Sequence, residues 1–432
     1  MALTSIALYA SFAYDLERTD FIKLITLYGA LFYLFYTLVK VEKLKPAFLT
    51  GLAIIFRMVF LFAIPNLSQD FYRFIWDGRM LLEGWNPYLY LPGVLMDGGI
   101  APIAQAAELY EGMGELSAGH YTNYPPINQL CFFLAALVSG KSILGSVIVM
   151  RLIIILSDIG IIIIGGKLLE KLKLPSYYIY IYALNPFIII ELTGNLHFES
   201  VMLFFLVLSL YLVYTDKWKL GAIAMAAAIS VKLLPLLTLP LLIQKLKLRK
   251  AVLFYLITLI MTTLFFLPFF SIKFLEAYAD TLSLWFINFE FNGSIYNLIK
   301  AIGYHIKGYN IIQTVGKIMP VLVVLVILII SFIKRNKNLP ELASGMLLAL
   351  SFYFFTASVV HPWYLSSLLL LCIFTNYRYP VVWSLFIILS YYTYSQSNFK
   401  ESYLMLALQY IPVYIYFFYE IFNTKKRKFL TL

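Results

Sequence analysis

Long apolar runs, separated by short polar segments, dominate this chain from its first residues onward. Eleven runs approach the ~20 residues that a membrane-spanning helix needs, and three shorter apolar runs lie between them. The long runs cover 2–16, 21–40, 47–65, 143–166, 176–192, 198–215, 250–270, 313–333, 340–358, 379–395 and 402–422, and the shorter ones 126–139, 219–244 and 362–375. The pattern predicts an all-α polytopic membrane protein with about 11–14 transmembrane helices.

Composition supports the same class. Of the 432 residues, 62% are hydrophobic and only 13% are charged. Soluble domains average about 45–50% apolar and ~25% charged residues, so this chain carries more apolar surface than a soluble fold of its size buries. We expect residues 1–432 to form a single domain embedded in the lipid bilayer, with no separate soluble domain.

The net charge of +11 is concentrated in short loops. Basic residues in such loops stay in the cytoplasm, so their positions orient the chain in the membrane. The basic segments are Lys40/Lys43/Lys45, Lys167/Lys171/Lys173, Lys217/Lys219, Lys245/Lys247/Arg249/Lys250, Lys334/Arg335/Lys337 and the tail 425–428. The positive charge is therefore a topology signal, and nucleic acid is not an expected partner.

This orientation places two polar loops outside the cytoplasm. For all basic loops to share one side, 126–139 must return to the outer face, and 219–244 must form a re-entrant hairpin that bends near Lys232 and Pro235. The loops 66–125 and 271–312 then lie outside, and we expect short amphipathic helices in them. The first of these loops holds seven acidic residues against two arginines.

The segment "SQDFYRFIWDGRMLLEGWNPYLYLP" opens the first outer loop. In a helix over 68–82, Asp70, Arg73 and Asp77 share one face at i, i+3 and i+7. This face is either an ion-pair ladder on an interfacial helix or part of an active site, with a carboxylate beside an arginine. Asn86-Pro87 predicts a turn, and Tyr124 lies in a second rigid turn, "TNYPP".

Four further ionisable residues stand at predicted outer ends of apolar runs. His197 and Glu199 occur in "NPFIIIELTGNLHFES", and His361 begins "HPWYL". Lys232 lies within an apolar hairpin, where a lysine is costly unless it has a partner. By contrast, we interpret Arg151 and Asp158, two turns apart on one helix, as a structural pair.

Together, these motifs resemble the C-type (GT-C) integral-membrane glycosyltransferases. The matching stretches are "DFYRFIWDG…GWNPY…YPP", "NPFIIIELTGNLHFE", "VKLLPLLTLP" and "HPWYL", in this order between residues 66 and about 370. They are most similar to mannosyltransferases that depend on polyprenyl-phosphate mannose. Residues 1–46 carry no motif of their own.

The resemblance implies a GT-C-like helix bundle, a polyprenyl-phosphate sugar donor and a glycan or glycolipid acceptor. It also implies a multi-pass protein of the bacterial inner membrane with its active site facing outward. An acidic residue in the first outer loop serves this family as catalytic base, and Asp70 matches it. The family often has an acidic pair there; Gln69 stands in the neighbouring position, so a divalent metal site is left open.

The chemistry of the residues agrees with that role. A carboxylate can accept the proton of an attacking hydroxyl, and cations can stabilise the departing lipid phosphate. We expect Asp70 to be the base of a single, inverting displacement, with Arg73, Lys232 and His361 near the phosphate. Sugar or acceptor contacts are then expected from Asp77, Asn86, Tyr124, His197 and Glu199.

Two other functions remain open at this level. A transporter or flippase for a lipid-linked sugar also needs intramembrane cations and polar groups on the outer face, although its usual repeat is not visible. A membrane acyl- or phosphoryl-transferase needs a compact histidine–acid or metal-binding motif, and only "HFE" at 197–199 comes near that.

Overall fold

A computed structural model describes residues 1–287, 289–396 and 398–423 of the chain. The basic tail 425–428, used above to orient the chain, lies outside these residues. Within them the fold is all-α, as predicted, and the only strand-like pairing is an isolated bridge between Phe291 and Val359.

The helices differ widely in length. The α-helices of more than eight residues are α1 Ala2–Tyr14, α2 Phe21–Glu42, α3 Pro46–Met58, α4 Asp70–Leu82, α6 Ala106–Ala118, α7 Pro126–Ser139, α8 Ile143–Lys171, α11 Glu199–Tyr214, α12 Trp218–Val231, α13 Ile243–Phe266, α14 Ile272–Ile287, α15 Ile295–Lys307, α16 Ile312–Phe332, α17 Leu339–Thr356 and α20 Tyr403–Asn423. Shorter segments are η1 Pro87–Leu89, α5 Pro92–Asp97, η2 Ser176–Tyr178, α9 Ile179–Ala183, α10 Pro186–Ile188, η3 Ile189–Gly194, η5 Leu267–Phe269, η6 Pro362–Leu365, α18 Ser366–Cys372 and α19 Tyr379–Phe386, with the nine-residue 3₁₀ segments η4 Leu234–Leu242 and η7 Ile387–Ser395.

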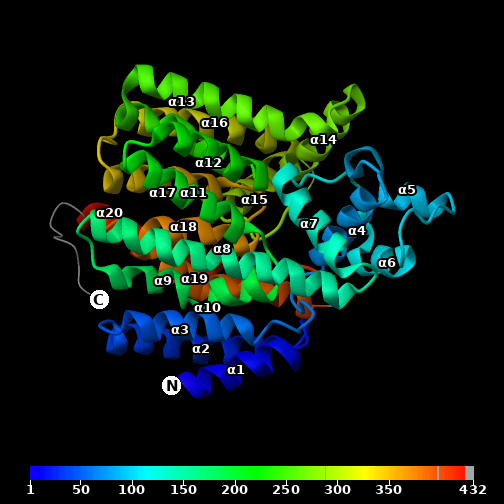
Figure 1. Cartoon of the computed structure of the whole chain (residues 1–432), viewed down its shortest axis with the longest axis horizontal. Coiled ribbons are helices and arrows are strands. Elements are labelled where there is room, and N and C mark those ends of the chain that lie inside the picture. The colour runs from blue at the N-terminus through cyan, green and yellow to red at the C-terminus, as the bar shows by residue number, and fades with distance from the viewer. Residues whose placement is uncertain (288, 397, 424–432) are drawn as a thin grey trace.

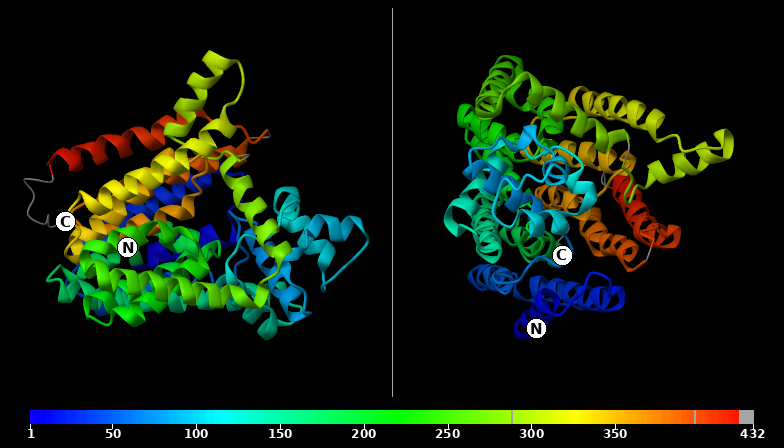
Figure 2. Two further views of the ribbon diagram at one scale, coloured as in Figure 1. Left: turned by 90° about the horizontal axis from the view of Figure 1, so that it is seen from above. Right: turned by 90° about the vertical axis from the view of Figure 1, so that its right-hand side faces the viewer.

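Most of these helices run in roughly the same direction as one bundle (Figure 1). The first three helices form one side of it, α13 and α16 the opposite side, and α8 crosses the middle. The short helices α4–α7 cluster at one end of the bundle, and the loops that join α2 to α3 and α16 to α17 lie at the other. In both views of Figure 2, α15 stands away from the bundle. The acidic loop 66–125 and the basic loops therefore lie at opposite ends of the molecule, as the sequence predicts.

Six helices in the described residues are long and apolar enough to cross a membrane. A seventh span would be the segment 186–194 together with α11, which is bent by 115° at the break between them. The sequence predicted two separate spans here, 176–192 and 198–215. The structure instead divides 176–192 into short pieces, because Pro186 removes a backbone donor and η3 is a π-helix.

The predicted hairpin over 219–244 has its reversal at the expected place. Helix α12 ends at Val231, Lys232 is extended, and η4 then leads back along the bundle. At 14 residues α12 is only about 21 Å long, too short to cross a bilayer upright. Both arms of the hairpin, α12 and η4, pack against α13. This packing fixes the position of Lys232 at the turn between them.

One sequence-based expectation is wrong: Arg151 and Asp158 are not partners. Two helical turns separate them by ~10 Å along α8. Asp158 instead pairs with Arg57 of α3, at 2.8 Å between Oδ2 and Nε. Its other oxygen accepts hydrogen bonds from Tyr182 (3.1 Å) and Ser200 (2.9 Å), so Asp158 links α3, α8, α9 and α11.

This pair predicts a strong effect on stability. Replacing Asp158→Asn leaves the buried Arg57 guanidinium without a counter-ion, which typically costs about 3–5 kcal/mol. The measurement is thermal unfolding of the purified protein in detergent. The control Asp216→Asn alters the exposed Lys250–Asp216 pair and should cost less than ~1 kcal/mol. Equal losses of melting temperature in the two variants would contradict a structural role for Asp158.

Candidate active site

The candidate site is built around the break between η3 and α11. A broken helix leaves backbone carbonyls without partners, which is costly in an apolar medium. The buried guanidinium of Arg151 satisfies them by donating to the carbonyls of Thr193 (2.9 Å), Gly194 (3.0 Å) and Leu61 (3.0 Å). Arg151 thereby joins the break to the loop that precedes α4.

A second connection joins the same two segments. The backbone N–H of Leu67 donates to Asn195 Oδ1 at 3.3 Å, and Asn195 Nδ2 donates to Glu191 at 3.4 Å. The following residue, Leu196, has a φ of 61°, a left-handed conformation that is uncommon outside glycine and asparagine. These contacts place His197 and Glu199 beside the start of α4.

Asp70 is the first residue of α4 and is partly exposed, whereas most of the helix behind it is buried. Within the described part of the chain its carboxylate accepts no hydrogen bond. Burial raises the pKa of Asp70 above its usual range, and the charges of Lys232 and Arg18 oppose this rise. A carboxylate with a raised pKa and no committed partner suits a general base.

Lys232 and Glu199 form an ion pair next to Asp70. The ammonium of Lys232, on a side chain that is 20% exposed, donates to Oε1 of the buried Glu199. Oε2 of Glu199 has no hydrogen-bond partner among the described residues. The ammonium also lies 5.9 Å from the ring centroid of Tyr364. One side of Lys232 is thus anchored, and the rest of the ammonium is available to an anion.

Aromatic rings connect the two histidines of the site. The indole of Trp363 stacks with His197 at 3.6 Å and with His361 at 4.5 Å between ring centroids. His361 also stacks with Phe291 at 5.2 Å. Burial, with smaller effects of Lys232 and Arg18, lowers the pKa of His361 to about 3. At neutral pH His361 is therefore a neutral hydrogen-bonding group rather than a cation.

Sequence analysis did not single out Arg18, which the structure brings to this site. Its guanidinium lies 3.2 Å from the ring centroid of Tyr394, which belongs to η7. Its charge acts on both Asp70 and His361. A signal was available: Arg18 lies in a loop on the acidic side of the membrane, where the positive-inside rule does not explain an arginine.

Three of the expected binding residues make their contacts elsewhere, two of them in one cluster. Arg73 Nε pairs with Asp77 at 2.8 Å, and Arg73 Nη1 donates to the carbonyls of Ser117 (2.6 Å) and His120 (3.1 Å). Gln129 donates to Asp77 at 2.9 Å. These contacts fasten α4 to the end of α6, to the segment after it and to α7. The third residue, Asn86, caps η1 and donates to the carbonyl of Phe269 at 3.2 Å.

Tyr124 lies between this cluster and Asp70. Its ring packs against Phe74 and Phe132, at 5.0 and 5.6 Å between centroids. The charges of Asp70 and Asp77 both act on its hydroxyl. Of the nine residues expected at the site, the structure therefore gathers Asp70, Tyr124, His197, Glu199, Lys232 and His361.

The geometry gives little support for a preformed metal site. Among the described residues no three His, Cys, Asp or Glu side chains group closely enough to hold a metal ion. The side chain of Gln69, where the family often has a second acid, donates to the carbonyl of Met113 at 3.0 Å. The arrangement thus offers one free carboxylate with a lysine and an arginine near it.

Comparison with known proteins assigns the chain to a family. A family model described as alpha-(1->6)-mannopyranosyltransferase, N-terminal domain, matches residues 18–246, more than half of the chain. The chain is 25% identical over 181 residues to alpha-(1->6)-mannopyranosyltransferase A of Corynebacterium glutamicum, which is 40% of this chain and 33% of the relative. The protein of the same name from Mycobacterium tuberculosis is 21% identical over 173 residues, 40% of this chain and 32% of that relative.

These alignments span about a third of the length of both curated relatives. The region matched by the family model contains Arg18, Asp70, His197, Glu199 and Lys232, so most of the gathered residues lie inside it. His361 and Tyr394 lie beyond it. The match of the family model shows that this chain belongs to the alpha-(1->6)-mannopyranosyltransferase family.

Proposed function

We propose that the protein transfers a mannosyl residue from a polyprenyl-phosphate donor to a hydroxyl of a glycan or glycolipid. Transfer takes place at the end of the bundle that carries α4, on the extracytoplasmic face of the bacterial inner membrane. Asp70 is the catalytic base. The observation that carries the proposal is a partly exposed carboxylate that accepts no hydrogen bond from the described residues and on which the charges of Lys232 and Arg18 act.

The carboxylate explains activation of the acceptor. As the acceptor oxygen attacks the anomeric carbon, its proton passes to Asp70, and the bond from the sugar to the lipid phosphate breaks. A single displacement of this kind inverts the anomeric configuration. The family description specifies an alpha-(1->6) linkage, so an inverting step requires a β-linked donor and attack by a primary hydroxyl.

The cations explain how the leaving group is stabilised. The phosphate gains negative charge as it departs, and preorganised cations lower the energy of that state. Lys232 is held by Glu199 on one side, and Arg18 is held over the ring of Tyr394. The neutral imidazole of His361 supplies a hydrogen bond rather than a charge. Arg73 is held by Asp77 and two carbonyls, and its remaining nitrogen, Nη2, is buried, so it serves as a scaffold for α4.

The first test replaces the proposed base. Asp70→Asn preserves the shape of the side chain but cannot accept the proton, so transfer should fall by about 10²–10⁴-fold. The assay follows labelled mannose from β-linked polyprenyl-phosphate mannose into a mannoside acceptor, with purified protein. The control Asp97→Asn changes an exposed acid of the same loop and should retain activity. Wild-type turnover in Asp70→Asn would remove this residue from the mechanism.

The same base predicts a pH dependence. Asp70 acts only when ionised, so kcat should fall as the pH decreases through its pKa. Because burial raises that pKa, the acidic limb should lie above the ordinary aspartate value of about 3.9. The limb is measured from kcat between pH 4 and pH 8, and it should disappear from the residual activity of Asp70→Asn. An unchanged limb in that variant would assign the titration to another group.

Donor affinity tests Lys232. Lys232→Met should weaken binding of the donor lipid in nanodiscs at least tenfold, and Lys232→Arg should restore it only in part. The matched control is Lys300→Met, since Lys300 also forms a partly buried lysine–glutamate pair, with Glu290. Asp70→Asn should bind the donor nearly as well as wild type. If Lys232→Met binds normally, Arg18 is the remaining candidate for the phosphate contact.

Labelling tests which face carries the site. Both native cysteines are buried, so a cysteine at exposed Glu111 of α6 and one at exposed Lys337 provide clean reporters. In intact cells an impermeant thiol reagent should modify Glu111→Cys and leave Lys337→Cys unmodified until the membrane is opened. The reverse pattern would place Asp70 on the cytoplasmic side.

A further inference from the structure

A cavity of about 690 Å³ lies at the end of the bundle opposite Asp70. Five segments that are distant in the sequence form it: the ends of α8 and α11, the start of α13, the residues around the start of α17, and the turn before α19. Ligand pockets commonly measure 300–1,000 Å³. None of the residues proposed for mannosyl transfer lines this cavity.

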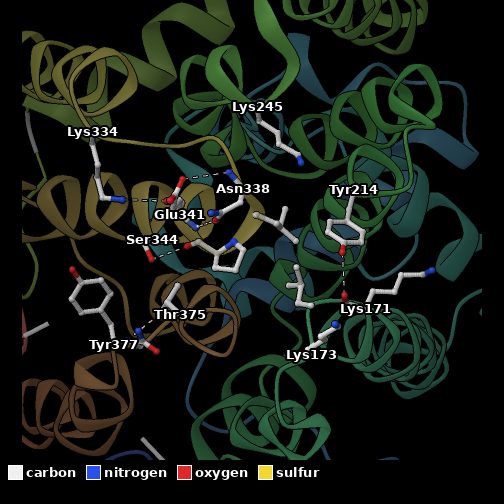
Figure 3. A pocket seen from close by; sticks show the side chains of 14 residues that line it. Lys171, Lys173, Tyr214, Lys245, Lys334, Asn338, Glu341, Ser344, Thr375 and Tyr377 are labelled. Atoms are coloured by element: carbon white, nitrogen blue, oxygen red, sulfur yellow. Dashed lines mark hydrogen bonds between the residues drawn. The ribbon is translucent and has the colours of Figure 1, made fainter. Parts of the chain in front are cut away.

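Four lysines line the cavity: Lys171, Lys173, Lys245 and Lys334. In Figure 3, Lys245 extends between Asn338 and Tyr214, and Lys334 and Lys173 lie on opposite sides of the cavity, while Lys171 points away from its centre. No described carboxylate forms an ion pair with any of the four. Three separate loops thus bring uncompensated positive charge to one hollow.

The single acid in the lining does not neutralise these lysines. Glu341 pairs with Arg335 at 3.0 Å and accepts hydrogen bonds from the backbone of Lys337 and Asn338, as part of the capping box of α17. Lys334 donates to a backbone carbonyl, that of Glu341, at 3.2 Å. Burial lowers the pKa of Lys334 even though the charge of Glu341 acts against this change. An anion bound in the cavity would raise the pKa again.

The remaining lining has two further properties. Leu172, Leu339 and Pro340 provide an apolar surface between the lysines. Oδ1 of Asn376 is buried and has no hydrogen-bond partner in the described part of the chain, so it is available to a hydroxyl donor. A cationic rim, an apolar surface and a free acceptor together suit an anionic headgroup that carries hydroxyls and remains attached to acyl chains.

We propose that this cavity binds the phosphate headgroup of an anionic membrane lipid. Its position favours a lipid over a soluble phosphate compound, because the apolar helices end there and the headgroup layer of a membrane begins. Basic pockets between helices on the cytoplasmic side of membrane proteins are known to hold such headgroups. This site is separate from the one proposed for transfer, and it does not depend on the proposed function.

The test measures lipid binding to the full-length protein in detergent by native mass spectrometry. Phosphatidylglycerol is the probe, the zwitterionic phosphatidylcholine is the comparison without net charge, and glycerol 3-phosphate is the soluble phosphate. The pocket variant carries Lys173→Gln and Lys245→Gln. The control variant carries Lys40→Gln and Lys43→Gln, which remove the same charge from a basic loop outside the cavity; Lys43 lies 5.7 Å from the ring of Tyr177 much as Lys245 lies 5.8 Å from that of Tyr214.

Phosphatidylglycerol should bind wild type in preference to phosphatidylcholine, and the pocket variant should bind it roughly tenfold or more weakly. The control variant should bind it as wild type does, and Asn376→Leu should weaken it with all lysines intact. Equal weakening in the pocket and control variants would mean a general surface charge effect and would overturn the site. Displacement of the lipid by glycerol 3-phosphate at similar concentration would overturn the assignment to a lipid.

Discussion

The buried guanidinium of Arg151 holds the most unusual feature of this bundle, the break between η3 and α11. A helix that bends by 115° inside an apolar bundle exposes carbonyls that no water can reach. Arg151 satisfies two of them and also the carbonyl of Leu61, so the break and the loop before α4 become one unit. The ion pair of Glu199 with Lys232 lies beside the helix break. Asp70 lies at the end of the loop before α4.

Charged residues in this protein divide into two groups according to how fully their hydrogen-bonding capacity is used. Arg57 and Arg73 are buried, and each binds a carboxylate together with backbone carbonyls. Such residues fix the geometry of helices, and the one nitrogen that each has without a partner among the described residues, Nη2, is buried away from a ligand. Asp70, Arg18 and Lys232 are only partly buried. Glu199 holds Lys232 and the ring of Tyr394 holds Arg18, while the Asp70 carboxylate accepts no hydrogen bond from the described residues. The positions of these residues in the sequence do not distinguish the two groups. Only the contacts that their side chains make in the folded structure do.

The two proposed sites lie at opposite ends of the bundle, with α8 between them. At 29 residues this helix is about 43 Å long, more than the ~30 Å of a hydrocarbon core. One end presents a carboxylate between cations and the other a basic hollow with an apolar surface. The two ends thus differ in charge, and the lysines of three basic loops converge on one cavity.

The sequence by itself determined the class of the protein, the polarity of its two ends and the position of the hairpin tip at Lys232. These properties follow from local composition, because the length of an apolar run and the charge beside it act within one segment. It also singled out Asp70, which stands at a helix start within a recognisable motif. The spacing on one helix already allowed the pair of Arg73 with Asp77. Tertiary structure alone decided the partners that come from distant segments: Asp158 with Arg57, Glu199 with Lys232, and Arg18 with the ring of Tyr394. Such contacts join segments as much as 376 residues apart, as Arg18 and Tyr394 are, and no local pattern encodes which buried charge will neutralise which.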